Sequence, residues 1–191
     1  MYRIISVIVK YIVIAALLLS CSTQQTQQEE MPVSFITVHH SMLNIPEKAT
    51  YQWSDGFTRQ AESSLIKNVD MWGLLKQSIE QEMHRKGYRQ IAQAQQADLN
   101  ISFMAALESS LGDAEIARQY GLVPGLMVKN VDQERYQKGT LIFDVVNPKT
   151  NTLAWRTAGQ ALATLADIPL DKRRARIDVF VKKLLAFLPE K

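Results

Sequence analysis

The chain has 191 residues, with 22 lysines and arginines against 19 aspartates and glutamates, so its formal net charge is +3. Two of the basic residues, Arg3 and Lys10, lie in the first twenty positions, and the rest of the chain is almost neutral. This balance argues against a nucleic-acid-binding protein, which needs a strongly basic face. The length predicts one domain with a sizeable core.

The first twenty residues combine positive charge with a short apolar run. Arg3 and Lys10 precede the nine apolar residues "YIVIAALLL". A secretory signal has a basic start and about 7–15 apolar residues, whereas a membrane-spanning helix needs about 20. The pattern predicts a signal peptide over residues 1–20. A membrane span interrupted by Lys10 is the alternative.

The end of this run carries a resemblance. Residues Leu18, Leu19, Ser20 and Cys21 resemble the lipobox of bacterial lipoproteins. The resemblance implies lipidation of Cys21, cleavage before it and acylation of the new amine. Cys21 is the only cysteine, so it cannot form an internal disulfide. A buried core cysteine is the alternative.

Residues 21–32 read "CSTQQTQQEEMP", which is polar and has no apolar periodicity. Such a composition predicts a flexible tether between lipid and domain. Ser22 stands where an aspartate commonly signals inner-membrane retention. We therefore expect an anchor in the outer membrane, facing the periplasm, if the source is Gram-negative. Residues 33–191 are predicted to form the domain.

The domain begins with strand signals and then a helix. Strands are expected over 33–40 and 49–53, which are β-branched and aromatic. Asp70 is a candidate N-cap and Gly87 a candidate C-terminal stop for the helix between them. Gly73 weakens this helix by about 1 kcal/mol relative to alanine. Its apolar stripe recurs at helical spacing: Met71, Trp72, Leu75, Ile79 and Met83.

The middle of the chain is the least regular part. A strand over 97–107 places Leu99, Ile101 and Phe103 on one face. Within 108–138, "DAEIARQYG" predicts a short helix capped by Asp113 and ended by Gly121. The apolar loop "LVPGLMV" over 122–128 follows. It either covers the core or is exposed as a partner contact.

Residues 139–161 predict a hairpin of two alternating strands around the turn "NPKTN". Leu141, Phe143 and Val145 share one face, and Leu153 and Trp155 share one in the second strand. If Val145 lies opposite Trp155, then Asp144 lies opposite Arg156. Both packing and charge favour that register.

A final helix is predicted from Asp171, as N-cap, until Pro189 stops it. Its apolar stripe comprises Ile177, Phe180, Val181, Leu184 and Leu188. The order of elements predicts an α+β fold. We expect a mainly antiparallel sheet of about five strands with two helices packed on one face.

The hairpin "GTLIFDVVNPKTNTLAWR" resembles the signature of bacterial lipoproteins that share domain of unknown function 4136. Other pieces fit in chain order: "TYQW", "EQEMHRKGYRQ", "ADLNISF" and "VKKLLAFLP". The similarity covers roughly 33–189, and "LVPGLMVKNVDQERYQ" departs from it. The resemblance implies an envelope lipoprotein of α+β fold and transfers no activity.

Catalytic and metal-binding patterns are weak. His39 and His40 point to opposite faces of a strand, and His84 has no second ligand at helical spacing. No serine lies in a Gly-x-Ser-x-Gly elbow. Glu108 and Asp144 are conceivable as paired carboxylates, although a salt bridge fits Asp144 better. We therefore predict no catalytic residue, metal or cofactor. The tryptophans are expected in the core: Trp53, Trp72 and Trp155.

The last helix carries a basic run. Lys172, Arg176 and Lys183 fall within about 40° of one another, opposite the apolar stripe. A solvated helix face is the simpler interpretation, and contact with anionic headgroups or an acidic partner is the alternative.

Together these features predict a non-enzymatic, lipid-anchored domain that binds another envelope component. A carrier of small ligands or lipids, with a pocket between sheet and helices near 121–128, is the first alternative. An unrecognised hydrolase is the second.

Overall fold

The computed structural model describes residues 32–39, 45–46, 49–54, 70–92, 96–108, 111–127 and 131–190. They belong to one compact unit, Met31–Lys191, which is distinct from Met1–Glu30. The buried hydrophobic side chains of the described residues lie between Ala49 and Leu188. A unit with its own core is expected to fold without residues 1–30. In this described part, no helix combines the length and apolar character needed to cross a bilayer.

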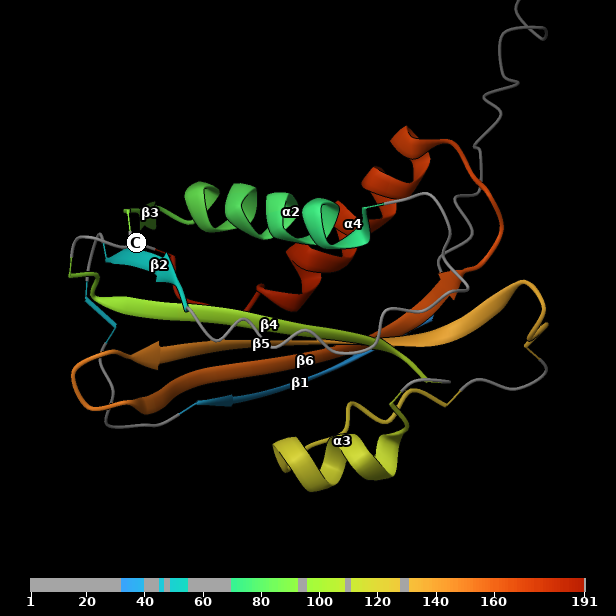
Figure 1. The fold of residues 1–191 in the computed structure, drawn as a ribbon, viewed down its shortest axis with the longest axis horizontal. Helices are drawn as coiled ribbons and strands as arrows, with labels where there is room; N and C mark the ends of the chain where they lie inside the picture. Colours follow the sequence, from blue (N-terminus) through green and yellow to red (C-terminus); the bar gives the residue numbers. More distant parts are fainter. Residues whose placement is uncertain are drawn as a thin grey trace, which may run out of the picture. The chain divides into compact units, whose positions relative to one another are not determined.

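The fold is α+β, as predicted, and is built on one mixed sheet (Figure 1). Among the described residues the sheet has six strands in the order β1-β6-β5-β4-β2-β3. Their bounds are β1 Val33–His39, β2 Thr50–Trp53, β3 Arg89–Gln90, β4 Leu99–Leu107, β5 Tyr136–Asn147 and β6 Thr152–Thr164.

The sheet is antiparallel from β1 to β4 and parallel at the edge formed by β2 and β3. β2 runs parallel to β4 because the chain between them crosses over through a helix. The two-residue strand β3 was not predicted. It is held by the amides of Arg89 and Ile91, which donate to Ala49 O at 3.2 Å and Tyr51 O at 2.9 Å.

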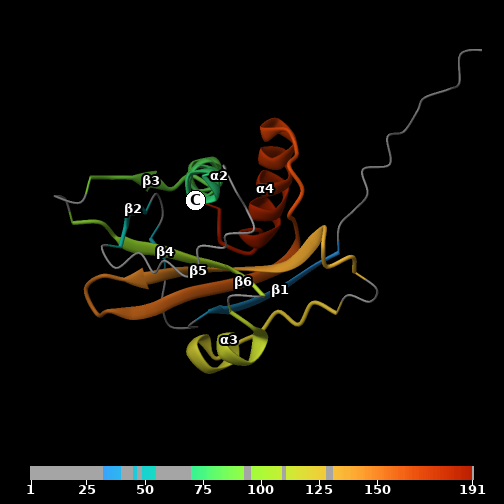
Figure 2. The same cartoon turned by 45° about the vertical axis from the view of Figure 1, so that its right-hand side comes forward.

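Helices cover both faces of the sheet. α2 (Met71–Arg85) and α4 (Leu170–Leu184) lie on one face, as expected, and the short α3 (Asp113–Tyr120) lies on the other (Figures 1 and 2). Under α2 and α4 the main core includes Ile79, Met83, Phe103, Phe143, Trp155, Val181 and Leu184. A smaller core under α3 comprises Met104, Ala106, Leu111, Ile116, Leu122, Ile142 and Ala158.

Both predicted ends of α2 are confirmed. The Asp70 carboxylate accepts a hydrogen bond from the amide of Gly73 at 2.8 Å, which satisfies one of the free amides of the first turn. Gly87 follows the last turn with φ of 90°, which glycine adopts without strain. The presence of glycine at position 73 has a steric reason, because a Cβ there would lie 2.2 Å from Asp70 Oδ2.

The predicted caps of the other two helices were wrong. Gly112, not Asp113, is the N-cap of α3, because the Asp113 carboxylate turns to Lys138 and Gln160. Gly121 ends α3 as expected, with φ of 71°. α4 starts after Pro169 rather than at an Asp171 cap. Pro169 is its N-cap, its carbonyl accepts from the Arg173 amide at 3.0 Å, and no side chain caps the helix.

The end of α4 also differs from the prediction. The helix stops at Leu184, before Pro189. A tight turn follows, in which the Leu188 amide donates to Leu185 O at 3.0 Å. This turn buries Leu188 against the main core.

The hairpin has the predicted register: Val145 lies opposite Trp155 and Asp144 opposite Arg156. One detail was wrong. A register shift between Val145 and Val146 pairs Leu153 with Val146, so Leu153 does not share the face of Trp155. The bulge brings Ala154 into the main core beside Trp155.

Candidate functional site

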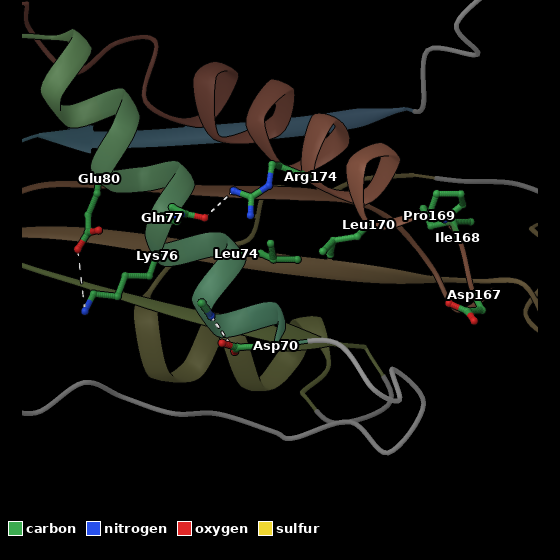
Figure 3. A pocket seen from close by; sticks show the side chains of 11 residues that line it. Asp70, Leu74, Lys76, Gln77, Glu80, Asp167, Ile168, Pro169, Leu170 and Arg174 are labelled. Atoms are coloured by element: carbon green, nitrogen blue, oxygen red, sulfur yellow. Dashed lines mark hydrogen bonds and ion pairs between the residues drawn. The ribbon is translucent and has the colours of Figure 1, made fainter.

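The candidate site is an open groove of about 910 Å³ between the first half of α2 and the start of α4 (Figure 3). The chain before α4 forms its third wall. The lining residues are Asp70, Gly73, Leu74, Lys76, Gln77, Glu80, Asp167, Ile168, Pro169, Leu170 and Arg174. The groove therefore offers charges of both signs around an apolar strip.

Local structure fixes most of the polar lining. Asp70 is occupied as the cap of α2. Arg174 of α4 donates to Gln77 Oε1 of α2 at 2.5 Å, so this bond joins the two helices across the groove (Figure 3). Lys76 lies 3.9 Å from Glu80 and 5.6 Å from the centre of the Trp53 ring. Glu80 in turn accepts a hydrogen bond from Trp53 Nε1 at 2.8 Å.

The lining combines charged, polar and apolar side chains. It includes the titratable residues Asp70, Lys76, Glu80 and Asp167, and no serine, threonine, cysteine or histidine. Leu170 is 56% exposed and offers an apolar contact at the rim. The groove can therefore hold a segment of mixed polarity.

The carboxylates considered as a catalytic pair lie in different ion pairs. Asp144 is bonded to Arg156, with only 17% and 19% of the two side chains exposed. Glu108 lies 3.2 Å from Lys138. The two carboxylates therefore pair with different cations, and Glu108 shares Lys138 with Asp113.

A buried polar network beneath α3 was missed from the sequence. Gln160 is fully buried on β6. Its amide nitrogen donates to Asp113 at 2.7 Å and to Thr140 at 3.1 Å, and its oxygen accepts from the Leu126 amide at 2.9 Å. Lys138 Nζ donates to Asp113 at 2.7 Å. The signal available in the sequence was a glutamine among the mostly small residues of "TAGQALAT".

Electrostatics hold this network together. Burial by itself raises the pKa of the Asp113 carboxyl, but hydrogen bonds from Lys138 and Gln160 outweigh burial and leave the pKa below its ordinary value. Burial lowers the pKa of Lys138, and its carboxylate partners more than reverse that shift. α3 is therefore attached to the sheet by charged groups.

The loop over 122–128 covers the core for most of its described length. Leu122, Pro124 and Leu126 are buried, and Met127 is 87% exposed. The Ser34 hydroxyl donates to Pro124 O, which ties the loop to β1. The carrier hypothesis placed its pocket here, but the groove described above lies on the opposite face, between α2 and α4.

The other predicted site residues are dispersed. His84 is exposed on α2, and His39 ends β1. His40, Leu18, Leu19, Ser20 and Cys21 lie outside the described residues. Over the described ranges, no three His, Cys, Asp or Glu side chains gather as a metal site. Lys172, Arg176 and Lys183 are all exposed along α4.

The tryptophans pack as expected. Trp155 is 3% exposed in the main core. Trp72 stacks on Phe103, with ring centres 5.4 Å apart, and Trp53 meets the same ring edge-on at 5.9 Å. Trp155 therefore lies in the main core, and Trp53 and Trp72 pack against it.

Comparison with known proteins identifies the family of this chain. None of the curated proteins matches the chain. The family described as "Domain of unknown function (DUF4136)" matches residues 38–190. The chain belongs to the DUF4136 family. The family resemblance seen in the sequence is thereby confirmed, over nearly the same span.

Several solved structures are similar to this DUF4136 chain at low sequence identity. The PelC dodecamer from Paraburkholderia phytofirmans is 9% identical, with a TM-score of 0.51 over 84% of this chain and 99% of PelC. A DUF4136 family protein from Bacteroides thetaiotaomicron is 14% identical, with a TM-score of 0.48 over 83% and 98%. A PDZ domain protein from Parabacteroides distasonis is also 14% identical, at 0.47 over 84% and 36%.

Proposed function

We propose that this DUF4136 chain is a lipid-anchored envelope lipoprotein whose domain binds another envelope component and has no enzymatic role. The sequence Leu18-Leu19-Ser20-Cys21 after a basic, apolar start is the observation that carries the anchor. In this proposal residues 1–20 are the signal and 21–32 the tether. The anchor lies in the outer membrane, facing the periplasm, if the source is Gram-negative.

The groove supports the binding role. It is open, lies between two helices, and is lined by the cations Lys76 and Arg174 and the carboxylates Glu80 and Asp167 (Figure 3). Such a mixed lining fits a polar segment of a partner protein better than an acyl chain, because desolvating charges against hydrocarbon is costly. The carrier and hydrolase alternatives have no comparable support in the described residues.

Intact mass tests the anchor. Mature protein extracted from membranes is expected to lack residues 1–20 and to carry three acyl chains on Cys21. A Cys21→Ser variant is expected to lose these additions. An unmodified, full-length mass for the native chain would refute the anchor.

Crosslinking tests the binding role. A photoreactive residue at Gln77 is expected to capture a specific envelope protein, and the same residue at Lys149, in the exposed hairpin turn, is the control. Recovery of the same products from both positions would contradict binding at the groove. A second copy of the chain is one product to look for, since the PelC structure of similar fold is a dodecamer.

A further inference from the structure

The outer face of α4 concentrates positive charge. Lys172, Arg176 and Lys183 are exposed there. At 100° per residue they fall within about 40° of one another, and Val179 lies beside them within about 60°. The acidic residues of the helix, Asp171 and Asp178, are rotated by about 100° or more from this face.

These cations are not used to hold the fold. Among the described residues, none of the three forms an ion pair, whereas Arg85, Arg118, Lys138 and Arg156 each do. The buried side of α4, with Ile177, Val181 and Leu184, faces the main core. The basic face therefore points away from the rest of the domain and is open to a partner.

Apolar side chains accompany the charges. Val179 is 49% exposed within the basic face, and Phe187 is 76% exposed in the turn that follows α4. Basic residues can bind anionic headgroups while neighbouring exposed apolar side chains such as Val179 and Phe187 contact the boundary with the acyl chains. A purely acidic protein surface would pair with the cations but leave the Phe187 side chain exposed to water, whereas an anionic bilayer can contact both.

We propose that this face of α4 lies against an anionic phospholipid surface and orients the domain on the membrane. The proposal builds on the lipid anchor proposed above. The twelve residues from Cys21 to Pro32 can span at most about 40 Å when fully extended. An anchor at Cys21 would hold the domain within that distance of the headgroups, where a weak contact would suffice.

Co-sedimentation of the unlipidated fragment Met31–Lys191 tests the contact without the anchor. The fragment is expected to bind vesicles of phosphatidylcholine and phosphatidylglycerol, and not vesicles of phosphatidylcholine alone. Binding is expected to disappear at about 1 M salt, where the Debye length is about 3 Å. Equal binding to both vesicles, or no binding to either at low salt, would overturn the proposal.

Charge reversal locates the surface. The triple variant Lys172→Glu, Arg176→Glu, Lys183→Glu is expected to lower the partition coefficient more than about 100-fold. The matched control reverses Arg118, Arg135 and Lys149, which are exposed elsewhere, and is expected to stay within about threefold of the wild type. Thermal melting confirms that both variants fold. Similar losses in both would mean that net charge alone drives binding.

Phe187→Ser keeps every charge and provides a second measurement. It is expected to lower binding about tenfold at low salt without changing its salt dependence. If anionic vesicles fail to bind while crosslinks from α4 reach an acidic envelope protein, the face recognises protein and the lipid proposal is wrong. The intact-mass experiment decides the anchor separately, because the fragment lacks Cys21.

Discussion

The Asp144 carboxylate and the Arg156 guanidinium form two hydrogen bonds, of 2.6 and 2.5 Å, across the β5–β6 hairpin. The same guanidinium donates to Tyr120 O at 3.1 Å and lies 5.4 Å from the centre of the Tyr120 ring. One pair of strand residues therefore also holds the end of α3. This explains why the two charges are placed opposite each other beneath a helix.

Removing one partner of this pair is expected to be costly. Arg156→Gln leaves the Asp144 charge poorly solvated and is expected to lower the free energy of unfolding by about 3 kcal/mol. Adding Asp144→Asn is expected to recover part of the loss, and urea denaturation measures both. Arg118→Gln is the control, because Arg118 is 77% exposed in its ion pair with Glu115 and should change stability by less than about 1 kcal/mol. Equal effects of Arg156→Gln and Arg118→Gln would contradict the role of the buried pair.

The cap of α2 predicts that the effect of Gly73→Ala on stability changes sign when Asp70 is removed. Asp70→Ala is expected to cost about 1 kcal/mol. Gly73→Ala should destabilise the wild type, because its Cβ would collide with the Asp70 carboxylate. In the Asp70→Ala background the same change should stabilise by up to about 1 kcal/mol, through helix propensity. Thermal melts of the four chains test this, and additive effects would refute the steric link.

The Asp113 network predicts sensitivity to acid. The folded pKa of Asp113 lies below its ordinary value, so the unfolded chain binds the proton more readily. The contribution of Asp113 is present above the unfolded pKa of about 3.9 and is lost as pH falls through the folded value. Asp113→Asn should therefore flatten the dependence of stability on pH below about 5. Asp171→Asn, on the exposed side of α4, is the control, and denaturation at several pH values is the measurement. An unchanged acid slope in Asp113→Asn would disprove the assignment.

Gly159 predicts a steric rescue. A Cβ at this position would lie 2.6 Å from the Phe35 ring and 2.7 Å from the Phe180 ring. Gly159→Ala is therefore expected to destabilise by about 1–3 kcal/mol through overpacking. Phe35→Leu in the same chain should recover part of this loss, although it costs stability alone. Chemical denaturation of the three variants measures the coupling, and the absence of any coupling would show that β1 moves aside freely.

Local patterns predicted much of this fold. The cap at Asp70 and the register of Asp144 against Arg156 could be read because each depends on neighbours within one element or one hairpin. The predicted start of α4 was wrong because this helix begins after Pro169 without any side-chain cap, so a search for a capping side chain misplaced it. The bulge that moves Leu153 depends on packing of Ala154, which alternation alone does not reveal.

Long-range pairing was harder to predict. β3 exists only because Ala49 and Tyr51 offer carbonyls to its edge, and these come from a distant part of the chain. The sequence of β4 does indicate that its second face is covered. Met104 and Ala106 alternate with core residues on β4 and are themselves buried, so the second half of that strand is apolar on both faces. The groove escaped prediction because it arises where two separate helices meet.

The pairing of β1 with β6 has a consequence for how the molecule is made. β1 is the first strand of the described domain, and Val33 lies opposite Ala161, near the other end of the chain. A polypeptide that emerges with its N-terminus first must hold β1 without its partner until β6 is available. Such late closure slows folding and leaves an apolar strand open to wrong partners. The domain should therefore complete its sheet only after nearly the whole chain has emerged, and escort by a chaperone would matter most in that interval.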